Sequence, residues 1–136
     1  MMKTVRFGLM ITALLGAGMM APTVGHAATW HSGTPKVLQG KWKTKSFRRS
    51  PNTVKLSVHI GKSQIFGYEV ETYHGRTTLD NALPVINKGH YRYLGHHTYY
   101  ITDLKSNGMS SGHVKVKWYN HHTIKIAGTP HYYYRY

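Results

Sequence analysis

The chain has 136 residues, with 18 lysines and arginines against only 4 aspartates and glutamates, so its formal net charge is +14 at pH 7. It contains no cysteine, which excludes a disulfide-framed toxin or growth factor. This length allows one small domain with a modest core, and the excess of positive charge favours anionic partners.

Residues 1–27 have the pattern of a secretory signal peptide. Lys3 and Arg6 form a short basic region, an apolar run extends from Phe7 to Met20, and small residues surround a cut after Ala27. The run has 14 residues, whereas a membrane-spanning helix needs about 20. The pattern therefore favours cleavage over the alternative of an uncleaved membrane anchor.

Cleavage would leave residues 28–136 as a single secreted domain with no transmembrane anchor. Without Lys3 and Arg6 the domain has 16 basic and 4 acidic residues, a net charge of +12. Ten of the 11 histidines remain, and histidine adds further positive charge in acidic media because its ordinary pKa is about 6.5. We expect an extracellular monomer that is retained at the cell wall by its charge.

The domain is predicted to begin with a short helical turn and a first strand. Thr34 can cap the turn, and Pro35 suits a first helical position. The following "QGKWKTK", residues 39–45, reads as a strand that points Trp42 and Thr44 inward and its three lysines outward.

A hairpin is predicted next, because residues 53–60, "TVKLSVHI", alternate between apolar and polar side chains. A turn at Gly61-Lys62 leads into a second strand, residues 63–73, in which Gly67 indicates a bend or bulge. Residues 74–88 are predicted to be a loop, with a strand over Arg76–Leu79 as the alternative.

Two segments then resemble each other, residues 91–101 and 116–126, which share His-His-Thr and a final isoleucine. Each predicts a hairpin around a central turn. Residues 105–112 between them, "KSNGMSSG", are typical of a flexible loop. The tyrosine-rich end predicts a last strand that starts at Pro130. We therefore predict an all-β fold, a small antiparallel barrel of about seven to eight strands rather than a sandwich.

The pattern Gly40-x-Trp42, at the start of the first strand, resembles the entry to the lipocalin and related calycin barrels. The resemblance implies that Trp42 closes one barrel end and packs against a basic residue of the last strand, here Arg135. No TDY-like motif accompanies it. The segment 33–42, "GTPKVLQGKW", also resembles small secreted proteins of lactic-acid bacteria with a "GTPKxLxGxW" segment, a resemblance that brings no activity with it.

Enzymatic function is not expected, because the domain has four carboxylates, Glu69, Glu71, Asp80 and Asp103, and no GxSxG elbow. Glu69 and Glu71 lie about 7 Å apart on one strand face. We interpret them as acids that balance nearby basic residues, and we predict no catalysis and no cofactor.

Basic residues interleaved with aromatic ones predict an anion-binding surface. The candidates are Lys41, Lys43, Lys45, Arg48, Arg49, Lys115, Lys117 and Lys125. Export argues against intracellular nucleic acid, so the expected partner is a cell-envelope polymer or surface: teichoic acid, acidic polysaccharide or anionic lipid headgroups. The alternative is a basic surface that serves solubility only.

Two further functions remain open at this point. A lipocalin-like barrel would bind a small apolar ligand in its interior. Paired histidines at the two hairpin turns would bind zinc or copper if their side chains converged, since neutral imidazoles are good ligands for both metals. The candidate ligands are His96, His97, His121 and His122.

Overall fold

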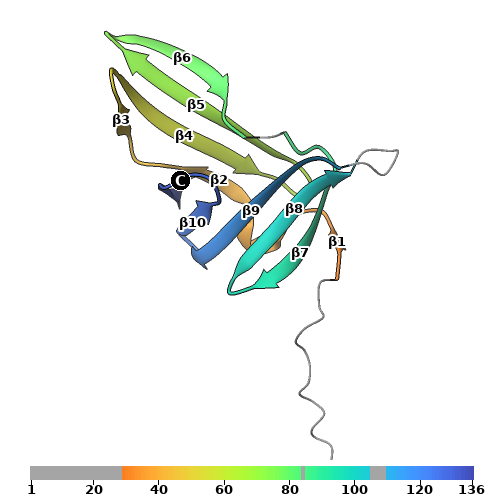
Figure 1. The fold of residues 1–136 in the computed structure, drawn as a ribbon. Coiled ribbons are helices and arrows are strands. Elements are labelled where there is room, and N and C mark those ends of the chain that lie inside the picture. The colour runs from red at the N-terminus through yellow and green to blue at the C-terminus, as the bar shows by residue number, and fades with distance from the viewer. Residues whose placement is uncertain (1–28, 84, 105–109) are drawn as a thin grey trace, which may run out of the picture.

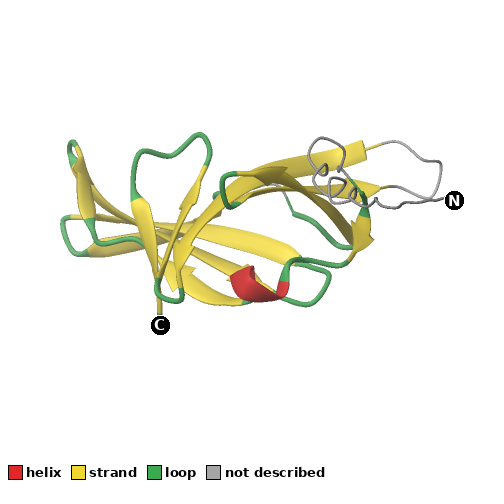
Figure 2. Cartoon of the chain, turned by 90° about the horizontal axis from the view of Figure 1, so that it is seen from below, coloured by secondary structure: helices red, strands yellow, loops and turns green. Residues whose placement is uncertain are grey.

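The computed structural model describes residues 29–83, 85–104 and 110–136, so the predicted signal peptide, residues 1–27, lies outside the described residues. Over these residues the fold is all-β, with eleven strands in one antiparallel sheet and one 3-10 turn, η2 (Figures 1 and 2). The elements are β1 (His31–Ser32), η2 (Lys36–Leu38), β2 (Gly40–Lys43), β3 (Phe47–Arg49), β4 (Asn52–Ile60), β5 (Ile65–Tyr73), β6 (Arg76–Asn81), β7 (Gly89–Gly95), β8 (Thr98–Leu104), β9 (Ser110–Asn120), β10 (Thr123–Ile126) and β11 (Tyr132–Arg135). No helix among the described residues is long and apolar enough to cross a membrane.

The sheet does not close into the predicted barrel of seven or eight strands. Its order is β1-β7-β8-β9-β10-β11-β2-β4-β5-β6, with β3 paired to β4 beside this path. The long strands β4 and β5 continue beyond the body of the molecule and pair there with the short strands β3 and β6 (Figure 1). These additional short strands, together with β1, raise the strand count above the predicted one.

Backbone contacts nevertheless join the two sides of the sheet at one end. Ile65 of β5 forms an isolated antiparallel bridge with Ile86. Gly89 at the start of β7 donates its N–H to the carbonyl of Ser63 at 2.8 Å and accepts from Gly33 at 2.7 Å. A Cβ on Gly89 would lie 3.1 Å from the carbonyl oxygens of Ser63 and Gly33, which explains why this position is a glycine. We call these five residues the seam.

The core follows from the period-two alternation of the strands. The predicted inward row of β4 is buried, and it packs with Trp42, Tyr133 and isoleucines and valines of the other strands in one cluster. Burial of each such side chain contributes about 1.5–3 kcal/mol. The members of the cluster are Leu38, Trp42, Val54, Leu56, Val58, Ile60, Ile65, Ile86, Ile101, Val114, Val116, Ile124, Ile126 and Tyr133.

Gly67 does not mark a bulge, as its sequence context suggested. The β4–β5 register continues without a shift from Thr53–Thr72 to Ile60–Ile65. A Cβ at position 67 would lie 3.0 Å from the Leu83 side chain, so the glycine makes room for that leucine instead. The alternative of a strand over Arg76–Leu79 is confirmed, and the strand extends to Asn81.

The helical turn is confirmed, but Thr34 does not cap it. No side-chain cap bond is present at η2, and the Thr34 hydroxyl donates to the carbonyl of Gly61. Both hairpins with histidine-containing turns are confirmed, β7–β8 and β9–β10. The predicted loop 105–112 is shorter than expected, because β9 begins at Ser110; residues 105–109 lie outside the described part. The last strand begins at Tyr132 rather than at Pro130.

Candidate functional site

Trp42 is anchored where the first and last major strands meet. Its side chain is 0% exposed, and its indole Nε1 donates to the carbonyl of Leu38 at 2.8 Å. Arg135 of β11 is the cross-strand partner of Trp42, and its guanidinium carbon lies 4.1 Å from the centroid of the indole ring. This is the contact that the G-x-W pattern predicted.

The Arg135 side chain also binds three backbone carbonyls. Its Nη1 donates to Gln39 at 2.7 Å and its Nη2 to Val37 at 3.2 Å, while its Nε donates to His121 at 2.6 Å. Gly40 has a φ of +144°, and a Cβ there would run into Nη1 of Arg135. The glycine of the pattern is thus required by both backbone conformation and space.

Four neighbouring strands, β9, β10, β11 and β2, carry the lysines on the outer face of the sheet. Because successive side chains alternate, burial of Trp42 and Thr44 turns Lys41, Lys43 and Lys45 outward, as predicted. These four strands contain no acidic residue. Lys117 and Lys125 are direct cross-strand partners, a pairing of like charges that is unfavourable by itself.

Tyrosine rings lie under the lysines on this face. Four ammonium groups approach a ring centroid: Lys43 to Tyr136 at 4.4 Å, Lys45 to Tyr134 at 5.6 Å, Lys117 to Tyr119 at 5.3 Å and Lys125 to Tyr132 at 5.1 Å. Each contact contributes about 0.5–1 kcal/mol at an exposed site and leaves the positive charge unneutralised. We call these eight residues together with Lys115 the Lys–Tyr face.

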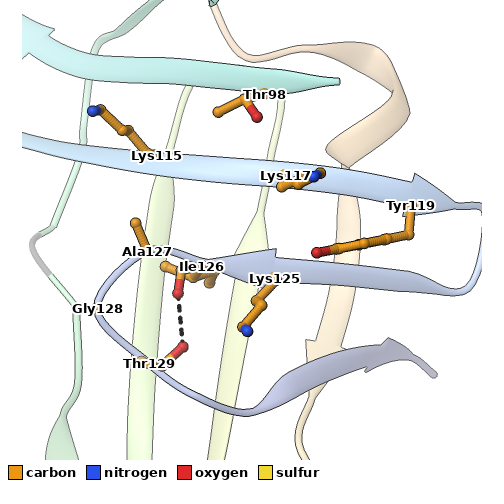
Figure 3. A pocket seen from close by; sticks show the side chains of 9 residues that line it. All are labelled: Thr98, Lys115, Lys117, Tyr119, Lys125, Ile126, Ala127, Gly128 and Thr129. Carbon is orange, nitrogen blue, oxygen red and sulfur yellow. Dashed lines mark hydrogen bonds between the residues drawn. The ribbon is translucent and has the colours of Figure 1, made fainter. Parts of the chain in front are cut away.

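A pocket of about 330 Å³ opens on the Lys–Tyr face between β8, β9 and β10 (Figure 3). Three lysines and three hydroxyl-bearing side chains line it, and the Thr129 hydroxyl donates to the carbonyl of Ile126 at 2.8 Å. We call it the three-lysine pocket. Its lining residues are Thr98, Lys115, Lys117, Tyr119, Lys125, Ile126, Ala127, Gly128 and Thr129.

Sequence reasoning missed the tyrosine partners and one lysine of this surface. Lys55 of β4 lines a second depression together with Lys43, Lys45 and Tyr134. The signal was present in the alternation of β4, which turns Lys55 away from the buried Val54 and Leu56. The tyrosines alternate in the same way around the buried Tyr133.

The two arginines that were predicted to bind anions, Arg48 and Arg49, do not belong to the Lys–Tyr face. Arg49 is neutralised, since its Nη1 lies 2.6 Å from a Glu69 oxygen and 3.2 Å from a Glu71 oxygen. This pairing lowers the pKa of Glu69 and raises that of Arg49. Arg49 is therefore not an available anion-binding group. Arg48 is exposed on β3 opposite Thr53, and neither of the two pockets that the face lysines line includes it.

Three of the four carboxylates predicted from the sequence are held by hydrogen bonds within the sheet. Glu69 and Glu71 share Arg49, and Glu71 also accepts from the Asn52 amide at 2.6 Å. Asp103 is 7% exposed and accepts the backbone N–H groups of Asn87 and Lys88 at 3.0 and 3.1 Å. These contacts join β3 to β5 and fix the chain before β7 against β8.

The predicted metal ligands His96, His97, His121 and His122 do not assemble into a metal site. Within the described ranges, no group of three or more histidines and acids is arranged to hold a metal ion. Instead, the rings of His97 and His121 flank Trp118, at 5.8 and 5.9 Å between centroids. His96 and His97 adopt positive φ angles of 52° and 59°, so the conformation of the β7–β8 turn determines the direction in which their side chains leave the backbone.

Comparison with protein-family models, with curated proteins and with solved structures found no match. Functional inference for this chain therefore rests on the charge distribution and on the geometry of the Lys–Tyr face.

Proposed function

We propose that this protein is a secreted, non-catalytic binder of anionic polymers or surfaces of the cell envelope. Teichoic acid, acidic polysaccharide and anionic lipid headgroups are the classes of partner that match its charge. The observation that supports this proposal best is the Lys–Tyr face, on which four lysines lie over tyrosine rings in or directly after strands that contain no acid.

Concentrated positive charge on one face gives the proposal its physical basis. Among the described residues, no lysine of the Lys–Tyr face belongs to an ion pair. The cation of the ion pairs found in this part of the chain is Arg49. A polyanion that binds there releases its counterions, and the affinity then falls as salt rises.

The proposal also states where in relation to the cell the protein acts and describes the architecture of its fold in more detail. Cleavage after Ala27 would release residues 28–136 as a monomer, held at the wall by its charge of +12. For the body we propose a calycin-like, barrel-shaped arrangement in which the two sides of the open sheet meet through the seam rather than through a continuous strand ladder, with Trp42 and Arg135 at one end. The seam and the Arg135 hydrogen bonds support it.

Replacement of four face lysines by glutamine tests this function. The variant Lys43→Gln, Lys45→Gln, Lys117→Gln, Lys125→Gln is compared with the unaltered protein for retention on purified cell walls across a salt series. Each lysine near an anionic surface contributes roughly 1 kcal/mol. We expect binding at low salt to weaken by at least about tenfold.

A control with the same change in net charge separates the face from overall charge. Lys36, Lys62, Arg76 and Lys88 are exposed and lie off the Lys–Tyr face, and their replacement by glutamine should weaken binding far less. Equal losses in the two variants would show that no particular face binds. Retention that stays strong from low to high salt would contradict the electrostatic proposal itself.

A further inference from the structure

The three-lysine pocket brings three positive charges next to an aromatic ring. Solubility alone does not require this arrangement. Its three ammonium groups come from two adjacent strands, and Lys117 and Lys125 face each other across the ladder. An anion between them would relieve their mutual repulsion. The pocket is thus suited to a sulfate, phosphate or carboxylate group.

The ring of Tyr119 forms one side of this pocket. Tyr119 points back along the sheet toward Lys117 and Lys125 (Figure 3). Its ring packs edge-on against Tyr132 with 5.5 Å between centroids, and the two residues are 41% and 42% exposed. Rigid, half-exposed rings of this kind offer a flat apolar surface with a hydroxyl at the edge.

Hydroxyl groups complete the lining. Thr98 and Thr129 border the pocket together with the Tyr119 hydroxyl, and all three can accept or donate hydrogen bonds. A sugar ring presents the complementary surfaces, namely C–H groups on its faces and hydroxyl groups at its edge. The pocket lacks a protruding leucine, isoleucine, phenylalanine or tryptophan that would enter a lipid layer, since its isoleucine, Ile126, is 1% exposed.

We propose that the three-lysine pocket binds one repeat of an anionic glycan, with the anionic group between Lys117 and Lys125 and the sugar ring against Tyr119. This inference rests on the proposed function and narrows its partner from any anionic surface to a charged carbohydrate polymer. The lysines supply attraction to every polyanion, and Tyr119 supplies the preference for sugar.

Two polymers of opposite composition separate these contributions. Dextran sulfate carries sugar rings and anionic groups, whereas inorganic polyphosphate carries charge without sugar. We expect Tyr119→Ala to weaken binding of dextran sulfate by roughly threefold to tenfold, the range of one aromatic contact. Binding of polyphosphate should change by less than about twofold, because the lysine charges remain. Calorimetry at fixed pH and salt gives both dissociation constants.

Matched variants keep the result interpretable. Tyr73→Ala removes a tyrosine of similar exposure, 47%, from the β5 end that projects from the body, and it should alter neither affinity. Tyr119→Phe keeps the ring and should retain most of the dextran sulfate affinity. Thermal unfolding of each variant identifies any loss of folded protein.

Four outcomes decide between the proposals. Equal weakening of both polymers by Tyr119→Ala, or no weakening of either, would overturn the glycan assignment. A loss in Tyr119→Phe as large as that in Tyr119→Ala would overturn ring stacking. Tighter binding to phosphatidylglycerol vesicles than to dextran sulfate would assign the face to a lipid surface. If Lys117→Gln with Lys125→Gln leaves both polymers unaffected, the proposed function fails as well, which distinguishes the two failures.

Discussion

At the scale of single residues, Arg135 ties the last strand to the residues before β2 and to the β9–β10 turn. It lies over Trp42 and donates to three backbone carbonyls that belong to two separated parts of the chain. We expect Arg135→Ala to lower the free energy of unfolding by about 2–4 kcal/mol, because it removes charge-assisted hydrogen bonds and a cation–π contact. Urea unfolding followed by tryptophan fluorescence measures this loss.

The conservative change Arg135→Lys tests whether geometry or charge matters. Lysine keeps the charge but cannot reach several carbonyls with one planar fork, so we expect it to recover less than half of the loss. Arg76→Ala, on the exposed strand β6, is the control and should change stability by no more than about 0.5 kcal/mol. A similar small effect at position 135 would contradict the structural role.

At the scale of elements, Arg49 joins β3 to β5 across the intervening β4. Its hydrogen bond to Glu69 lowers the pKa of that carboxyl group. The sign follows directly: a lowered folded-state pKa stabilises the fold above the unfolded pKa of about 4.3, and this contribution is lost as pH falls through the lower folded value. We predict that Arg49→Gln raises the Glu69 pKa, and NMR titration of the side-chain carboxyl carbon measures the shift.

The neighbouring arginine gives a close control for this prediction. Arg48 carries the same charge one position earlier, but the register places it opposite Thr53 rather than beside the acids. Arg48→Gln should therefore leave the Glu69 pKa almost unchanged. An equal shift in both variants would mean that the general positive field, and not the Arg49 contact, sets the pKa.

At the scale of the whole molecule, the histidines are a further source of positive charge besides lysine and arginine. All ten histidines of residues 28–136 are exposed or half-buried, so none is enclosed in the core. Histidine as a residue type carries more positive charge in acidic media than at neutral pH. We predict that the affinity for a polyanion is higher, and its decrease with salt steeper, at pH 5 than at pH 7. Binding isotherms at several salt concentrations measure both slopes, and equal slopes would contradict this prediction.

Local sequence patterns were enough to predict much of this fold, whereas the pairing of strands distant in the sequence could not be predicted from them. Alternation indicated the buried row of β4 and the outward lysines of β2, and turn residues indicated both histidine hairpins. The Trp42–Arg135 contact was predicted from a family resemblance. Sheet closure was not predictable in this way, because it depends on where β4 and β5 extend and on which edges acquire β1, β3 and β6.

For the candidate site as well, the local features could be predicted from the sequence and the long-range ones could not. Outward direction of each lysine follows from the strand period, but its tyrosine partner depends on which strands are neighbours and in what register. Arg49 illustrates the limit, since the acids that neutralise it are 20 and 22 residues further along the chain. Metal ligation by the histidine turns required the side chains of two hairpins to converge, which turn chemistry alone does not determine.

The pairing of β2 with β11 has a consequence for the biosynthesis of the protein. The two strands lie side by side in the sheet, yet Arg135 and the Gln39 carbonyl that it binds are 96 residues apart. A ribosome makes β2 early and β11 late, so the nascent chain cannot assemble this part of the sheet during most of its synthesis. Such distant contacts also slow folding. The proposed export would suit a chain in which the pairing of β2 with β11 waits for the last strand.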